Sequence, residues 1–195
     1  MKEDSIDDLL QTWHRERPDL DPWPSGIAAR IFRLSMHLRR HAETWLTPMG
    51  LSWETFEIIV ALRRNGAPFE MKPTALYNAT FLTSGAMTNR LDRAQEAGLN
   101  VRGADPDDRR GVVVGLTPAG VRLADSALKR YYEETSKLME HLKTDECTKL
   151  ADLLRILLVS FETTSTENRS GSLTTPNDKA VPSNRQRKTR TRKHS

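Results

Sequence analysis

One stretch of the sequence, residues 72–116, constrains the fold more than any other. It opens with a Pro that suits the first turn of a short helix over about 73–79, because that position needs no amide donor. After the linker TFL, the dipeptide Thr-Ser provides good N-caps for a second helix over about 83–97, and Gly98 is typical of a helix end. Two short helices with such a tight connection predict a helix-turn-helix.

The residues that follow predict a β-hairpin. The segment NVRGA from Asn100 forms one expected strand, the segment GVVVGL that ends at Leu116 forms the other, and the turn-rich DPDDRR joins them. A hairpin directly after a helix-turn-helix is a wing. We therefore expect a wing over about 100–116 and a winged helix-turn-helix as the central unit.

Helical periodicity surrounds this unit on both sides. Apolar residues spaced by three or four predict helices over about 27–46 and 53–64, and two more helices follow the wing. The first of these opens at Thr117-Pro118, and Asp145 is the expected cap of the second. A further N-terminal helix, opening near Ser5 with Asp8 three residues later, precedes the Pro-rich linker RPDLDPWPSG. The expected fold class is mainly α.

Charge and composition divide the chain into three parts. We expect an extra helix and linker over 1–25, the winged domain with its flanking helices over 26–163, and a disordered basic tail over 164–195. The chain has a net charge of +4, but the tail alone carries eight Lys and Arg against two Asp and Glu. The basic balance is therefore a property of the tail, and evidence for a nucleic-acid partner must come from the domain itself.

Several classes of protein are excluded by what the sequence lacks. A single cysteine excludes a disulfide framework and a thiolate zinc finger. No apolar run approaches the roughly 20 residues that cross a bilayer, and the acidic N-terminus has no apolar signal core. No phosphate-binding, metalloprotease, nucleophile-elbow or dinucleotide-binding motif is present. We expect a cytoplasmic protein that is not an enzyme and uses no cofactor or metal.

The second helix of the helix-turn-helix resembles a DNA-recognition helix in its pattern. If Met87, Leu91 and Ala94 set the buried face, the opposite face carries Gly, Thr, Asn and Asp residues. Small and hydrogen-bonding side chains early in a helix suit entry into the major groove N-terminus first, and Ser84 with Gly85 leaves the first amides open to a phosphate. An ordinary amphipathic surface helix has the same spacing, and this helix alone does not decide between the two interpretations.

The turn of the hairpin favours DNA binding. Asp108 and Arg110 are two residues apart, so they lie on the same side of a strand, where the acid can brace the arginine. A braced arginine at a hairpin tip is a good probe of the minor groove. The alternative is a solvated turn, which Asp-Pro-Asp-Asp makes in any protein.

The sequences LTSGAMTNRLDRAQEAGL and DPDDRRGVVVGLTPAG together resemble the MarR family of winged helix-turn-helix transcription regulators, over about residues 26–163. The resemblance implies a homodimer whose helical dimerisation region is formed by the N- and C-terminal helices. It also implies that the protein binds a pseudo-palindromic operator in double-stranded DNA, most often as a repressor. The residues expected to contact DNA are Thr83, Ser84, Gly85, Thr88, Asn89, Arg93, Asp108, Arg109 and Arg110, with Arg110 as the wing arginine.

The extra N-terminal helix resembles the urate-responsive branch of that family. The resemblance implies a ligand site made of Trp13, Glu57, Arg64 and Arg90. An aromatic surface and two guanidinium groups suit a flat, anionic, oxygen-rich ligand such as urate or another purine or aromatic acid. The alternative is that the charges form surface ion pairs and the Trp belongs to a core.

This site suggests a mechanism. Without ligand, we expect Glu57 to pair with Arg90 or Arg64 and hold the recognition helix in a DNA-competent position. An anionic ligand competes for the arginines and lowers DNA affinity, provided that it binds the two states differently. The sequence departs from the family pattern at three positions. Glu57 stands where the urate-responsive branch has Asp. Ala94 replaces a larger apolar residue, and Asn100 replaces an apolar strand residue.

Three other features have weaker functional interpretations. Cys147 allows a redox-responsive regulator of the same fold, although its apolar surroundings favour an inert thiol. His37 and His41 are spaced to share a metal, but no third ligand accompanies them. The basic tail suits a non-specific DNA arm. A helical protein-interaction module remains the alternative from another functional class.

Overall fold

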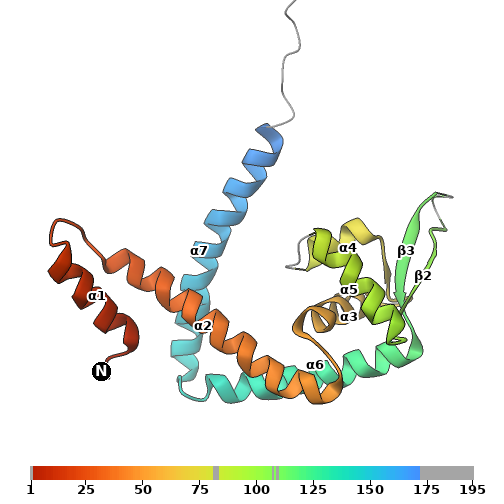
Figure 1. The fold of residues 1–195 in the computed structure, drawn as a ribbon, viewed down its shortest axis with the longest axis horizontal. Coiled ribbons are helices and arrows are strands. Elements are labelled where there is room, and N and C mark those ends of the chain that lie inside the picture. The colour runs from red at the N-terminus through yellow and green to blue at the C-terminus, as the bar shows by residue number, and fades with distance from the viewer. Residues whose placement is uncertain (1, 81–83, 107, 109, 172–195) are drawn as a thin grey trace, which may run out of the picture. The chain divides into compact units, whose positions relative to one another are not determined.

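A computed structural model describes residues 2–80, 84–106, 108 and 110–171; for 84–86 and 164–171 it describes the backbone only. The chain divides into two compact units, 1–138 and 139–195. Figure 1 shows a mainly helical chain with one small sheet. This confirms the predicted fold class, a mainly α winged helix-turn-helix. In the described part of the chain, no helix is long and apolar enough to cross a membrane.

The N-terminal extension is a helix that packs on the next one. Helix α1 spans Ser5–Glu16 and α2 spans Trp23–Leu46. The predicted opening near Ser5 is confirmed, and Asp4 before it is the N-cap, which forms a capping box with Asp7. Arg30 of α2 binds both of these carboxylates, at 2.9 and 2.6 Å. The helix α2 also begins four residues earlier than its apolar periodicity indicated, since Pro lies in its first turn.

The helix α3 (Trp53–Arg64) forms the centre of the domain. A 3-10 turn, η1 (Thr47–Met49), leads into it, and Ser52 caps it. One part of the core joins α3 to α2 and α6 through Trp45, Leu46 and Ile59, among other residues. The other part joins α3 to α4 (Pro73–Ala79), α5 (Ser84–Glu96) and the sheet. The helix-turn-helix α4–α5 was therefore predicted correctly, and α3 fixes it to the rest of the domain.

The sheet has one strand more than the predicted wing. Strands β2 (Asn100–Ala104) and β3 (Val112–Leu116) form the expected hairpin, in register from Asn100 opposite Leu116. The additional strand β1 (Glu70–Met71) pairs with the other edge of β3, which gives the order β1-β3-β2. The sequence predicted no strand between the helices over 53–64 and 73–79. A two-residue strand is too short to show an alternating pattern.

Helix α6 (Pro118–Met139) starts directly at the base of the hairpin. The Thr117 hydroxyl accepts a hydrogen bond from the Gly120 amide at 2.9 Å, as expected for an N-cap. A Cβ on Gly120 would lie only 2.0 Å from the Leu99 carbonyl oxygen, so this backbone contact requires glycine. The helix start is thus fixed against the end of the recognition helix.

The second unit consists mainly of α7 (Thr144–Gly171). Its start is two residues earlier than a cap at Asp145 would give, and Glu146 accepts a hydrogen bond from the Lys143 amide at 2.8 Å. The helix continues past Thr163, where disorder was expected to begin. Residues 172–195 lie outside the part that the structure describes.

Candidate nucleic-acid interface and ligand pocket

The recognition helix α5 has the two faces that its sequence predicts. Met87, Leu91 and Ala94 are buried, with at most 4% of each residue exposed. Thr88, Asn89 and Arg93 are all exposed on the other side. Figure 1 shows α5 packed with α3 and α4 beside the hairpin. A row of hydrogen-bonding side chains on an exposed helix next to a wing is the arrangement that a major groove accepts.

Four of the residues predicted to contact DNA are not described beyond their backbone, or not at all. Thr83 and Arg109 lie outside the described residues. Ser84 opens α5, but the structure describes only its backbone and that of Gly85. Their contribution to DNA binding stays a prediction.

At the tip of the wing, Asp108 contacts Arg110 differently from the prediction. The Asp108 carboxylate accepts a hydrogen bond from the Arg110 backbone amide at 3.0 Å, where we expected it to brace the guanidinium. Both residues are exposed. Asp108 therefore shapes the turn, as Asp commonly does two residues before an amide, and the Arg110 side chain extends from that turn.

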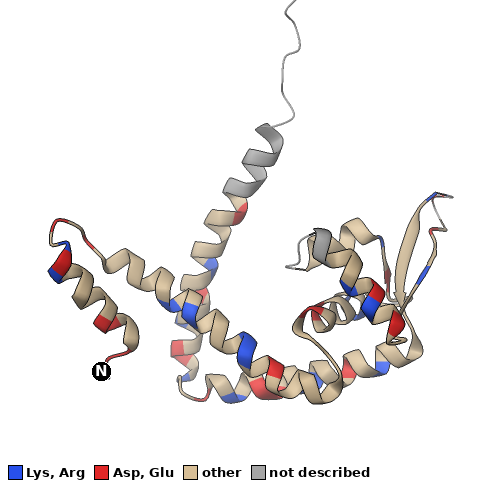
Figure 2. Cartoon of the chain, in the orientation of Figure 1, with Lys and Arg blue, Asp and Glu red and all other residues tan. Residues whose placement is uncertain are grey.

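The base of the wing is held by residues that the sequence did not indicate. The Asp105 carboxylate is almost completely buried and forms an ion pair with Lys72 at 2.7 Å, which ties the turn to the residue before α4. Arg102 of β2 binds Asp92 at 2.6 Å and Gln95 at 2.9 Å, both on α5. Figure 2 shows basic and acidic residues on both α5 and the hairpin. These contacts couple the wing to the recognition helix, and no local spacing in the sequence predicts them.

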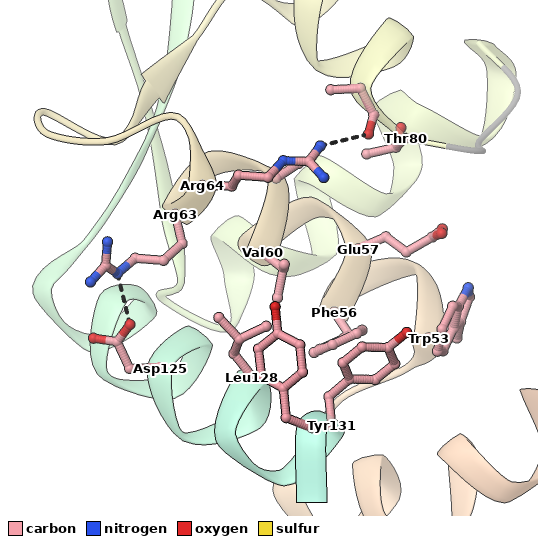
Figure 3. Close-up of a pocket in the computed structure, with 13 residues that line it drawn as sticks. Trp53, Phe56, Glu57, Val60, Arg63, Arg64, Thr80, Asp125, Leu128 and Tyr131 are labelled. Carbon is pink, nitrogen blue, oxygen red and sulfur yellow. Dashed lines mark hydrogen bonds and ion pairs between the residues drawn. The ribbon is translucent and has the colours of Figure 1, made fainter. Parts of the chain in front are cut away.

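A pocket of about 460 Å³ lies between α3 and α6. Its aromatic wall contains Trp53, Phe56 and Tyr131, with the Phe56 ring centroid 5.7 Å from that of Trp53 and 5.6 Å from that of Tyr131. Figure 3 shows Glu57 and Arg64 at the side of the pocket nearest Thr80. The pocket combines flat apolar surfaces with charged groups of both signs, which suits an aromatic ligand with a polar substituent.

The charged groups of the pocket differ in how strongly they are held. Arg63 forms an ion pair with Asp125 at 2.7 Å and lies over the Phe69 ring at 4.8 Å from its centroid. Arg64 is exposed and donates to the Ala79 carbonyl oxygen at 3.3 Å. Burial raises the pKa of Glu57, Trp53 opposes this shift, and the negative charge of Glu54 adds to it. Arg64 is thus the cation most available to an anion.

Only half of the predicted ligand set meets in this pocket. Glu57 and Arg64 line it, whereas Trp13 lies on α1 with 52% of the residue exposed. Glu57 was expected to pair with Arg90 or Arg64, but Arg90 of α5 contacts Glu54 at 3.4 Å and Arg64 donates to the Ala79 carbonyl oxygen. Trp53 was not among the predicted ligand residues, although it stands four residues before Glu57 and therefore shares its helix face.

The weaker candidates of the sequence have ordinary surroundings. His41 contacts Glu134 of α6 at 3.0 Å, and His37 is exposed. Within the described ranges, no group of three metal-ligating side chains is found. Cys147 is half-buried on α7.

Comparison with known proteins identifies the family. No family model matches the sequence. The HTH-type transcriptional regulator PecS of Dickeya dadantii is 32% identical over 149 residues, which cover 76% of this chain and 90% of PecS. The chain belongs to the MarR family of winged-helix transcriptional regulators.

Solved structures of transcriptional regulators have the same fold. A mutant of MarR from E. coli, complexed with operator DNA, matches with a TM-score of 0.60 and 23% identity, over 75% of this chain and 97% of that one. The organohalide-sensing regulator RdhR, in its 2,4-dichlorophenol-bound form, matches with a TM-score of 0.61 and 21% identity, over 67% and 76% of the two chains. At these identities the likeness concerns the fold.

Proposed function

We propose that this MarR-family protein is a homodimeric repressor that binds a pseudo-palindromic operator and is released by a small anionic aromatic ligand. The observation that carries the proposal is the exposed polar face of α5, tied to the wing through Arg102 and Asp92 at 2.6 Å. The MarR structure noted above is a complex with operator DNA. Thr88, Asn89 and Arg93 would contact base edges and phosphates, and Arg110 would enter the adjacent minor groove.

A second copy of the chain is the natural partner of the long helices. In α2, Ile27, Phe32 and Leu34 are each about half exposed or more. In α7, Leu153 and Ile156 are more than 60% exposed. Apolar surfaces of this extent on both helices favour burial in an obligate interface. A homodimer places two recognition helices on one duplex, so the operator would carry two related half-sites.

The ligand of the pocket would be a flat anion held by Arg64. Trp53, Phe56 and Tyr131 provide aromatic surfaces for stacking. Urate and other purine or aromatic acids match this chemistry. Of the predicted ligand residues, Trp13 and Arg90 do not line the pocket. Trp53 would supply the indole surface that was expected from Trp13.

Ligand binding would act on DNA affinity through α3. An anion near Glu57 favours the protonated form of that carboxyl group or displaces it from the pocket. Because α3 also contacts α5 through Ile58, Leu62 and Met87, a shift of α3 reaches the recognition helix. The effect requires that the ligand prefer one of the two positions of α3 over the other.

A DNA selection experiment tests the proposal. The full chain is incubated with a random duplex library, and a regulator of this kind enriches a pseudo-palindrome. Asn89→Ala should abolish or change the enriched sequence, whereas Lys149→Ala on α7, a solvent-exposed control, should not. Enrichment of no palindrome by the wild type would contradict the proposal and favour a protein-interaction module.

A ligand screen then tests the pocket. Purine and aromatic acids are titrated into the complex of protein and selected DNA, and release is measured for the wild type, Arg64→Gln and Cys147→Ser. We expect Arg64→Gln to weaken release by the acid and Cys147→Ser to leave it unchanged. Release by peroxide that depends on Cys147 would instead indicate a redox-responsive regulator.

A further inference from the structure

A half-buried carboxylate joins three helices of the winged helix-turn-helix domain. Glu54 lies in the first turn of α3, and its side chain is 13% exposed. One of its oxygens contacts Arg39 of α2, and the other lies 3.4 Å from Arg90 of α5. One carboxylate that contacts guanidinium groups on two different helices links those helices, and the two arginines cannot make this link without the acid.

The charge of this carboxylate is stabilised by its surroundings. Burial disfavours ionisation of Glu54, but its own backbone amide, Arg39 and Arg90 together outweigh burial and lower its pKa. Glu54 is therefore ionised throughout the neutral range. If the charge were removed, Arg90 would lose its contact with Glu54 and Arg39 would keep only the exposed Glu43, so repulsion between the two arginines would disfavour their close approach.

The position of Arg90 on α5 makes this bridge relevant to DNA reading. Arg90 follows Asn89 directly and lies between the exposed face and the buried face of the helix, with 27% of its side chain exposed. A contact at the border of the two faces fixes the rotation of a helix about its axis. The orientation of Thr88 and Asn89 thus depends on where Arg90 is held.

We propose that Glu54 is the positioning residue that fixes the recognition helix to α2, through Arg90 on one side and Arg39 on the other. This inference rests on the proposed function only in that α5 is the helix that reads DNA. It replaces Glu57, which the sequence favoured, with an acid three residues earlier that faces α5.

The first test measures DNA affinity with the full chain and the palindrome selected by the wild type. We expect Glu54→Gln to weaken binding by about five- to fiftyfold, the range of typical coupling between sites. Glu54→Asp keeps the charge and should restore most of the affinity. Glu43→Gln is the matched control, because Glu43 also contacts Arg39, at 3.5 Å, but is exposed on α2; this variant should bind like the wild type.

A double-mutant cycle separates positioning from general loss of stability. Since Glu54 acts through Arg90, Glu54→Gln combined with Arg90→Gln should bind no more than about twofold more weakly than the weaker single variant. Independent, additive losses would overturn the proposal, as would a Glu54→Gln variant with the affinity of the wild type.

Hydrogen exchange tests the bridge without DNA. Glu54→Gln should speed exchange of the α5 amides while those of α3 around Ile58 stay protected, and Glu43→Gln should change neither. If the wild type selects no palindrome, the proposed function fails, and this exchange experiment alone decides whether Glu54 holds α5. Unchanged α5 exchange in Glu54→Gln would refute the bridge.

Discussion

Replacing Asn100 with Val should stabilise the protein. Asn100 opens β2 with only 1% of the residue exposed, and neither its amide nitrogen nor its amide oxygen has a hydrogen-bond partner among the described residues. A buried polar group without a partner costs roughly 1–3 kcal/mol. Val removes that cost and also favours a strand. We therefore expect the free energy of unfolding to rise by about 2 kcal/mol and Tm by roughly 4–8 °C for a chain of this length.

Thermal and urea denaturation followed by circular dichroism measure this change. All variants are compared at one protein concentration, because the proposed dimerisation would make Tm concentration-dependent. Val101→Asn is the matched control, since Val101 is the next residue of β2 but is 51% exposed, and we expect a change of only about 0.5 kcal/mol. A Tm of Asn100→Val at or below that of the wild type would refute the argument and indicate that the amide is satisfied by a buried water molecule.

Three further predictions concern the pocket, the base of the wing and the tail. Because burial raises the pKa of Glu57 and its ionised form repels an anion, the affinity for an aromatic sulfonate of fixed charge should rise as pH falls through that pKa. Fluorescence titration measures it, and a pH dependence that persists in Glu57→Gln would contradict this origin. Gly120→Ala should lower the free energy of unfolding by at least about 3 kcal/mol, because its Cβ would lie 2.0 Å from the Leu99 oxygen. The control Ala119→Gly should lower it by only about 1 kcal/mol. Similar denaturation midpoints for the two variants would disprove the close contact. Truncation after Gly171 should leave the selected sequence unchanged but reduce the salt dependence of DNA affinity, and an identical salt slope would rule out a DNA-binding tail.

The fold was predictable because its signals are local. The helix-turn-helix and the hairpin follow from Pro73, Gly98 and the alternation after Asn100, each of which acts on its own neighbours. The buried face of α5 follows from the same kind of evidence, a spacing of three or four residues. Errors occurred where the signal was short, as in β1, or where a residue inside the first turn resembled a cap, as Asp145 does in α7.

The candidate site was less predictable because it depends on contacts between distant residues. The spacing of Glu57 and Arg64 placed them on one helix face, and they do meet in the pocket. Nothing local shows that Tyr131 closes the same pocket from α6, or that Glu54 and not Glu57 faces Arg90. Which of two acids one turn apart meets a given partner depends on the packing angle of the helices, which the sequence does not state.

The glycine at the start of α6 limits how this molecule can respond to a signal. The Thr117 hydroxyl and amide bond to the carbonyl oxygens of Gly98 and Leu99, at 2.7 and 3.0 Å, and Gly120 lies directly against the latter. No hinge is available between the end of the recognition helix and the beginning of α6. The two elements therefore move together, so a small tilt of the long helix α6 would also reorient the recognition helix.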